Sequence, residues 1–439
     1  MMKNETKIIQ AQPTKELFIS MLIKDVELSD AIIDLVDNSV DAAGSIRPDE
    51  NYNGLRINIE IKKDYFKIAD NCGGIPVDVA RQYAFRFGRP EEMPPTKHSI
   101  GWFGIGMKRA LFKLGKNFTI KSTTKNSYFL IEIDIDEWKD KKEDWTFQFK
   151  ELKVDLVDIR EDQTGTTIEV KPLHEEVSED FNLENFVSEF IIELERKHLL
   201  KISRGLSVQV NGKLLEARQL QLLQSDSFKA AYWQTTLPGP MNVKIYAGIS
   251  DRDLKDGGWY VFCNSRLILG PEQTEITGWI GGQRNIPKYH PQFDRFRGYV
   301  FFDADNVSLL PWNTTKTGMN MSSPSFRAVR QRMVTLMRPV INFLNALHEE
   351  RQKIPEEGER PLEKAVESAR RASLLEVDRS SEQFVYLKPT SHKSPNTGRI
   401  RYHKPIDDIE LVKKFFGVRT FKEVGERTFE YFLKMEFDK

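Results

Sequence analysis

The stretch DLVDNSVDAA (residues 34–43) sets acidic and amide side chains inside an otherwise apolar, helix-like run. Residues four apart lie on one face of a helix, so Asp34 and Asn38 point the same way, with Asp41 close to that side. An amide oxygen is a hard ligand suited to Mg²⁺, and a carboxylate one turn earlier could hold and deprotonate an attacking water. Taken alone, the pattern describes a solvated stripe on a half-exposed helix equally well.

The composition is that of a soluble globular protein. Of the 439 residues 30% are charged, and the formal net charge is zero, so any contact with nucleic acid must come from a local basic patch. Two cysteines cannot form a disulfide framework or a four-ligand zinc site, and no apolar run reaches the roughly 18 residues of a membrane span. We therefore expect two or three domains in a reducing cytoplasm, with no membrane association.

Hydrophobic spacing predicts the secondary structure. Helical and alternating periodicities, bounded by turn residues, predict one helix over 16–45, strands at 55–61 and 65–70, a helix at 77–87, a loop at 88–106, a helix ending at Gly115, and strands at 117–124, 127–135 and 165–173. Beyond residue 176 they predict one helix over about 178–200, a hairpin turning at Asn211-Gly212, further strands, and a helix over about 324–350.

The segment ADNCGGIP (69–76) ends a predicted strand with an acid and then two glycines. Glycine lets the backbone approach a flat ligand closely, and Asp70 could accept a hydrogen bond from an exocyclic amine such as N6 of adenine. A plain tight turn is the alternative. Similarly, DQTGTTIEV (162–170) leads into a strand, where the hydroxyl of Thr166 could reach a base through water.

The segment SIGWFGIGMKRA (99–110) places Gly101, Gly104 and Gly106 before a helix, with Lys108 on its first turn. Free N–H groups and the positive end of a helix dipole favour phosphates at such a position. A flexible surface loop is the alternative. The glycine patterns of the P-loop and of the Rossmann fold are both absent.

In this order and spacing, the four segments resemble the GHKL ATPase superfamily of gyrase, the ninety-kilodalton heat-shock chaperone, histidine kinases, MutL and MORC proteins. The resemblance covers roughly residues 16–172 and implies a Bergerat-type α/β sandwich that binds ATP and Mg²⁺. It assigns Asp34 as the catalytic acid residue that positions or activates water, and Asn38 as the Mg²⁺ ligand. The residues that it implies for nucleotide binding are Asn38, Asp41, Asp70, Gly74, Ile75, Gly101, Gly104, Ile105, Gly106, Met107, Lys108 and Thr166.

Two positions depart from the family pattern. Asp34 stands where clamp-type members usually carry Glu, and the missing methylene moves the carboxylate by about 1.5 Å, the length of a carbon–carbon bond. Cys72 replaces the first glycine of the adenine motif, and we interpret it as a small buried residue because no histidine lies nearby in sequence to activate it.

The second half resembles the βαβ transducer domain that follows the ATPase domain in MutL, gyrase and MORC proteins. Its loop PWNTTKTGMN (311–320) implies that Lys316 reaches the γ-phosphate, where a compact cation stabilises the transition state of phosphoryl transfer. An ordinary surface lysine is the alternative. The fold class is therefore α+β, with a predicted division into an ATP-binding domain (1–175), a transducer (176–352), a partly basic linker (353–404) and a small helical unit (405–439).

The stretches IIDLVDNSVDAA and WYVFCNSRLIL are closest to prokaryotic MORC-like ATPases, which implies an ATP-gated homodimeric clamp in a DNA-related or phage-defence process. Residues 1–15 would cross to the partner subunit, loop 88–106 would close as a lid, and an effector, helicase or nuclease encoded nearby would act with the clamp. The segment KPTSHKSPNTGRIRYHK (388–404) carries five basic residues and no acid, which suits DNA phosphates or a solvated linker. A chaperone-like clamp on protein clients and a weakly catalytic nucleotide sensor remain alternatives.

Overall fold

The computed structural model describes residues 13–88, 100–101, 104–141, 144–281, 286–352, 360–387, 400 and 402–437. They belong to two compact units, residues 1–387 and 388–439. Most of the predicted lid, of the N-terminal segment and of the basic strip lies outside the described residues. None of the described helices combines the length and apolar character needed to cross a bilayer.

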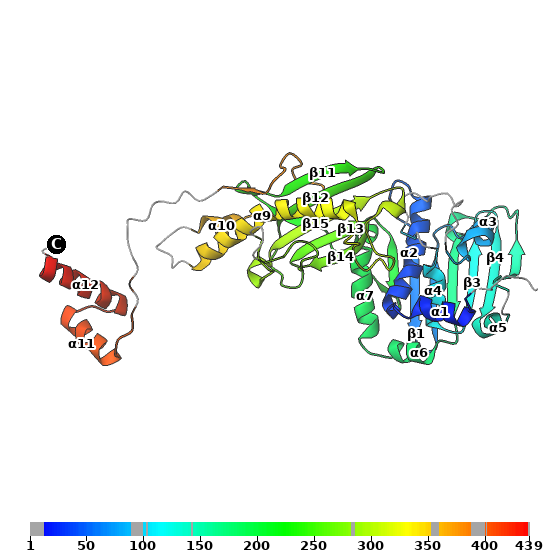
Figure 1. The fold of residues 1–439 in the computed structure, drawn as a ribbon, viewed down its shortest axis with the longest axis horizontal. Helices are drawn as coiled ribbons and strands as arrows, with labels where there is room; N and C mark the ends of the chain where they lie inside the picture. Colours follow the sequence, from blue (N-terminus) through cyan, green and yellow to red (C-terminus); the bar gives the residue numbers. More distant parts are fainter. Residues whose placement is uncertain are drawn as a thin grey trace, which may run out of the picture. The chain divides into compact units, whose positions relative to one another are not determined.

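The first unit opens with a mixed α+β layer built on a mainly antiparallel sheet, which fits the fold expected of a GHKL ATPase domain (Figure 1). Its eight strands run in the order β5 (Phe149–Lys153), β4 (Tyr128–Asp134), β3 (Asn117–Thr123), β6 (Gly165–Val170), β2 (Tyr65–Asp70), β1 (Arg56–Lys62), β7 (Ser207–Val210) and β8 (Lys213–Leu214). Alternation buries every second residue of β1, namely Ile57, Ile59 and Ile61, as the sequence predicted.

Three helices of this layer surround the motif residues. Helix α2 (Leu28–Ile46) packs against α4 (Gly106–Leu114), and α1 (Lys15–Ile23) packs against α4 as well. The single helix expected over 16–45 is wrong, because the chain turns between α1 and α2. A straight helix of that length would span about 45 Å, too far for both of its ends to contact the nine-residue α4.

The shorter helices differ from their predicted extents. The helix expected at 77–87 is α3 (Val77–Val79) continued by a π-helical segment (Ala80–Ala84), and α5 (Ile135–Asp140) follows β4. The single helix expected near 178–200 is three helices: α6 (Glu175–Phe181), α7 (Phe186–Lys197) and α8 (Leu199–Ser203). Asparagine stands at the end of α6 and at the start of α7, where its side chain favours helix termini over helix interiors.

The first sheet extends past the predicted domain boundary at residue 175. Strand β7 pairs in parallel with β1. Strands β7 and β8 form the expected hairpin, whose turn residues Asn211 and Gly212 both have positive φ. Parallel strands need a long connection, and here the chain runs from β1 through β2 to β6 and then through α6, α7 and α8 before it reaches β7. The layer that holds the motifs therefore includes residues 207–214.

A second, five-stranded sheet follows, in the order β11 (Ala231–Leu237), β12 (Met241–Ile249), β15 (Phe296–Asp303), β13 (Gly258–Cys263) and β14 (Arg266–Glu272). Helix α9 (Pro324–Gln352) packs along β12 and β15. Strands β13 and β15 are parallel, but the described residues between them hold β14 and a single 3-10 turn (Pro291–Phe293). The expected βαβ crossover is therefore not formed by the described part of this segment.

The linker predicted over 353–404 is wrong for residues 361–386. Helix α10 (Pro361–Glu367) buries Leu362 and Val366, and β16 (Arg370–Ser373) and β17 (Val385–Tyr386) pair with β9 (Gln221–Gln224) and β10 (Phe228–Lys229), respectively. A few well-placed apolar side chains hold this charged segment, which is why its composition was misleading. The most prominent is Phe384, whose ring contacts those of Phe228 and Phe343.

The second unit contains two helices, α11 (Ile406–Phe416) and α12 (Phe421–Phe437), as predicted for this region. Gly417 ends α11 in the left-handed conformation, with φ of 66°. The expected capping box is present: Glu423 N donates to Thr420 Oγ1 at 3.2 Å, and Thr420 N donates to a Glu423 carboxylate oxygen at 2.8 Å.

Candidate functional site

One cavity of about 290 Å³ brings together every residue that the sequence predicted for the site. Its walls come from α2, the end of β2, the start of α4, β6 and the 311–320 loop. The predicted residues that line it are Asp34, Asn38, Asp41, Asp70, Gly74, Ile75, Gly101, Gly104, Ile105, Gly106, Met107, Lys108, Thr166 and Lys316. Segments far apart in the sequence therefore share one cavity, while the role of each residue stays a prediction.

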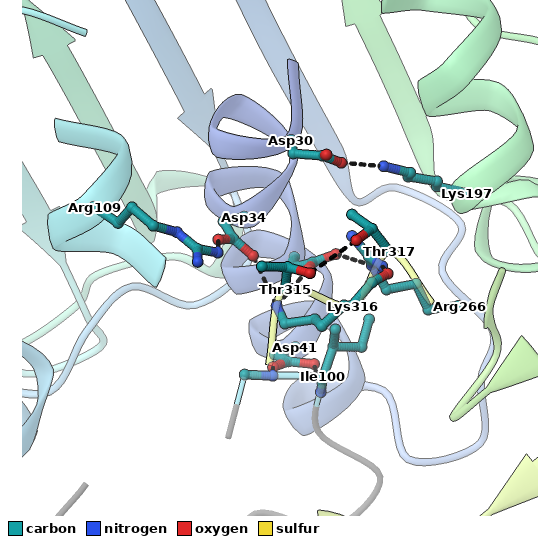
Figure 2. A network of polar contacts seen from close by, with 12 residues as sticks. Asp30, Asp34, Asp41, Ile100, Arg109, Lys197, Arg266, Thr315, Lys316 and Thr317 are labelled. Atoms are coloured by element: carbon teal, nitrogen blue, oxygen red, sulfur yellow. Dashed lines mark hydrogen bonds and ion pairs between the residues drawn. The ribbon is translucent and has the colours of Figure 1, made fainter. Parts of the chain in front are cut away.

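Asp34 lies between two cations. Asp34 is only 2% exposed, so the side of α2 that carries it does not face solvent. Lys316 Nζ donates to Asp34 Oδ1 at 2.9 Å, and the guanidinium of Arg109 on α4 pairs with Oδ2 (Figure 2). Lys316 is likewise buried and is not an ordinary surface lysine.

Asp37 is a second buried carboxylate, which the sequence analysis missed. Its Oδ2 accepts a hydrogen bond from Lys316 Nζ at 2.7 Å, and its Oδ1 accepts one from Arg266 Nε at 2.9 Å. Burial opposes the charged form, but the Arg266 and Lys316 cations outweigh it and hold the pKa of Asp37 well below its usual range. His198 Nε2 lies 3.2 Å from the same Oδ1, and burial lowers the pKa of this histidine, which favours its neutral form.

The charge of Lys316 is maintained by the two aspartates. Burial alone would lower its pKa, but the Asp37 and Asp34 carboxylates raise it above the ordinary value. One feature of the sequence could have indicated that Arg266 pairs with a buried carboxylate. This arginine stands at the start of the otherwise apolar run RLIL (266–269). Arginine is almost never fully buried unless it is paired, so such a residue in a core strand predicts a carboxylate partner.

Asp70, for which adenine recognition was predicted, also lines the cavity. Its Oδ1 accepts hydrogen bonds from Cys72 N at 2.9 Å and Thr166 N at 3.2 Å, and its Oδ2 accepts one from Ser39 Oγ at 2.7 Å. A carboxylate has about four acceptor positions, so one more donor, such as an exocyclic amine, can still be accepted. Burial raises the pKa of Asp70 despite these three bonds. Ser39 is a contributor that the sequence analysis missed.

The hydroxyl of Thr166 belongs to a small polar chain in the same wall. Thr166 Oγ1 lies 3.2 Å from Ser122 Oγ, which accepts a hydrogen bond from Ile75 N at 2.7 Å. Cys72 is 1% exposed, and burial raises the pKa of its thiol, which agrees with its interpretation as a small buried residue and not a nucleophile.

Helix α4 points its N-terminus at the cavity, since Gly106, Met107 and Lys108 of its first turn all line it. Its dipole and free N–H groups favour an anion there. The Lys108 ammonium is partly engaged, because it donates to the carbonyl oxygens of Ala84, at 2.9 Å, and of Gly104. Burial lowers the pKa of Lys108 to about 7, so its positive charge at neutral pH depends on what else enters the cavity.

Asn38 and Asp41, which follow Asp34 on α2, also line the cavity. Asp41 accepts hydrogen bonds from Ile100 N and Gly101 N, each at 2.7 Å, and so holds two described residues of the predicted lid (Figure 2). Asn38 is exposed among buried neighbours and lines the cavity. The described residues form no cluster of three or more His, Cys, Asp or Glu side chains that could hold a metal by themselves. A single amide oxygen fits Mg²⁺ that arrives with phosphates and keeps several waters.

A larger cavity, of about 1230 Å³, adjoins the first and shares Asp41 and Ser45 with it. Two of its cations, Lys201 and Arg204, are already paired with Glu50. No other predicted site residue lines it, so the smaller cavity is the candidate site.

Residues 26–166 match the family model described as Histidine kinase-, DNA gyrase B-, and HSP90-like ATPase. This segment contains every predicted site residue except Lys316. The match supports the GHKL superfamily for this layer, and with it ATP binding and hydrolysis as the chemistry of the fold. No curated protein is significantly similar to the chain.

Proposed function

We propose that the chain is a Mg-ATP-hydrolysing enzyme of the GHKL type, closest to prokaryotic MORC-like ATPases, and that it works as an ATP-gated homodimeric clamp in a DNA-related or phage-defence process. One observation carries the proposal: the motif residues of the first sheet and Lys316 of the 311–320 loop meet in one cavity, with Lys316 Nζ 2.9 Å from Asp34 Oδ1.

The cavity is lined by groups that suit each part of a nucleotide. Asp70 accepts a hydrogen bond from the adenine amine, while the α4 N-terminus and Lys108 hold the phosphates. Asp34 orients the attacking water and accepts its proton, and Lys316 neutralises negative charge that develops on the terminal phosphate. When bound, Mg²⁺ would withdraw charge from the phosphate oxygens, with Asn38 as its protein ligand.

Hydrolysis measured against protein concentration tests the clamp. We expect turnover per subunit to rise with concentration, because two subunits must meet before the closed state forms, and ATP favours that state only. Steady-state phosphate release over a hundredfold range of concentration, with sedimentation of the same samples, checks this. Turnover that is independent of concentration would contradict the dimeric clamp without contradicting ATP hydrolysis.

Replacing Asn38 by alanine should remove the Mg²⁺-dependent part of ATP binding, because the amide oxygen is its only proposed protein ligand. Calorimetry of ATP with and without Mg²⁺ should give equal affinities for Asn38→Ala and unequal affinities for the natural chain. Asn242→Ala, which removes an exposed amide outside this cavity, is the matched control. Unchanged Mg²⁺ dependence in Asn38→Ala would refute the ligand assignment.

A nucleotide sensor without useful turnover is the second candidate. It is favoured by the two cations on Asp34, which hold both carboxylate oxygens and so oppose proton acceptance from water. In that case the chain would bind ATP and dimerise while releasing phosphate negligibly, and an effector would read the closed state.

A further inference from the structure

The backbone of Lys316 is held much more firmly than a lysine needs for a flexible phosphate contact. Its φ is +56°, in the left-handed region that non-glycine residues rarely adopt. The loop is closed around it by Asn313 N donating to Gly318 O at 2.9 Å and Thr317 N donating to Asn313 Oδ1 at 3.0 Å. Such a conformation persists only where the surroundings enforce it.

The Arg266 side chain connects the backbone of this loop to α2. It is 1% exposed, and its Nη1 donates to the carbonyl oxygen of Lys316 at 2.7 Å while its Nε donates to Asp37 Oδ1 at 2.9 Å (Figure 2). Neither Arg266 nor Asp37 lines the cavity. The two therefore act on Lys316 rather than on a ligand.

The charges of the cluster are arranged so that the Lys316 ammonium can leave. Asp34 and Asp37 share it, yet each carboxylate also has its own guanidinium, Arg109 for Asp34 and Arg266 for Asp37. Removing one partner of a buried pair is costly because it strands the other charge. Here the departure of the ammonium would leave two paired carboxylates and no stranded charge.

We propose that Arg266 is a positioning residue that fixes the backbone of Lys316 and compensates Asp37, so that the Lys316 ammonium alone exchanges the two aspartates for the terminal phosphate of ATP. This inference rests on the proposed function. It makes the Asp37–Arg266 pair the element that lets the site distinguish ATP from ADP, because only the triphosphate offers the Lys316 ammonium a replacement anion.

The ratio of ADP to ATP dissociation constants, measured by calorimetry on the full chain, tests this. A charge-assisted contact to the terminal phosphate should make that ratio roughly 10- to 100-fold in the natural chain, and Lys316→Ala should bring it close to one. We expect Arg266→Met and Arg266→Lys to lower the ratio nearly as far, with ADP affinity unchanged. Lysine at 266 keeps the charge beside Asp37 but loses the rigid fork that also holds the Lys316 carbonyl.

Arg297 provides a matched control. It is a buried arginine of the same sheet, 5% exposed, whose Nη1 donates to the carbonyls of Asp294 and Phe296, and it does not line the cavity. Arg297→Lys should lower the unfolding temperature as Arg266→Lys does, without changing the ratio.

Two results would overturn the inference. In the first, both Arg266 variants keep the ratio of ADP to ATP dissociation constants of the natural chain while Lys316→Ala brings it close to one. In the second, Lys316→Ala itself keeps the ratio of the natural chain. A natural chain that binds neither nucleotide would instead refute the proposed function.

Discussion

Asp34→Asn is expected to hydrolyse ATP roughly 10²- to 10⁴-fold more slowly than the natural chain, while still binding it. The asparagine amide keeps the size and shape of the side chain but cannot accept a proton from water. Steady-state phosphate release at saturating Mg-ATP measures the rate, and calorimetry with ATP measures the binding that should remain.

The same change should also destabilise the fold, since Arg109 and Lys316 would lose the carboxylate between them. Breaking a buried ion pair by removing one partner costs about 3–5 kcal/mol, so the unfolding free energy must be measured beside the rate. Asp30→Asn is the matched control: it lies one turn earlier on α2 and pairs with Lys197, outside the cavity. A natural hydrolysis rate in folded Asp34→Asn would exclude Asp34 as the base and favour the sensor.

Gly74→Ala should destabilise the first unit by about 4 kcal/mol or more, an effect reserved for severe backbone or core disruption. Gly74 has φ of +73°, and a Cβ there would lie 2.2 Å from the carbonyl oxygen of Thr123. A backbone atom cannot yield as the end of a flexible side chain can, so the 73–75 segment must move away from β3. Because Gly74 and Ile75 line the cavity and Ile75 N donates to Ser122 Oγ, the cavity would change shape as well. Denaturant unfolding and ATP calorimetry measure the two effects.

Gly212→Ala separates the clash from the conformational cost. Gly212 has a similar φ, +82°, but no atom lies within 4 Å of the position that a Cβ would take. Its alanine variant should cost only about 1–2 kcal/mol, the penalty for a left-handed residue with a side chain, and should leave ATP binding unchanged. Equal losses of unfolding free energy and of ATP affinity in the two variants would show that the close approach of Gly74 to β3 is not what makes Gly74→Ala damaging.

Local patterns were sufficient for much of the first sheet and for its cavity. The i to i+4 spacing of Asp34 and Asn38, the turn after Asp70 and the glycines before α4 each depend on neighbouring residues, and their order along the chain carried the family resemblance that indicated the site. Two of the cations around them, Arg109 and Arg266, could not be located in this way. Arg109 and Arg266 reach the aspartates from other elements, and only the packing of α4 and β14 against α2 brings them within hydrogen-bond distance.

Composition was also an uncertain guide to domain limits. Residues 361–386 are charged enough to resemble a linker, yet Leu362, Val366 and Phe384 are buried, and β16 and β17 are both paired. Conversely, β7 and β8 lie after a long helical segment but complete the first sheet. In both segments the domain limit is set by strand pairing between residues far apart in the sequence. Periodicity within one segment does not indicate which distant strand it pairs with.

The contact between Asp34 and Lys316 joins residues 282 positions apart in the chain. At roughly 5–20 residues per second, a ribosome needs on the order of 15–60 s to make the intervening segment. During that time the first sheet and its motifs are already synthesised, but the 311–320 loop does not yet exist. Under the proposed function, the residues expected to hold the nucleotide are therefore made well before the lysine expected to contact its terminal phosphate, so hydrolysis would begin only after the 311–320 loop has been made.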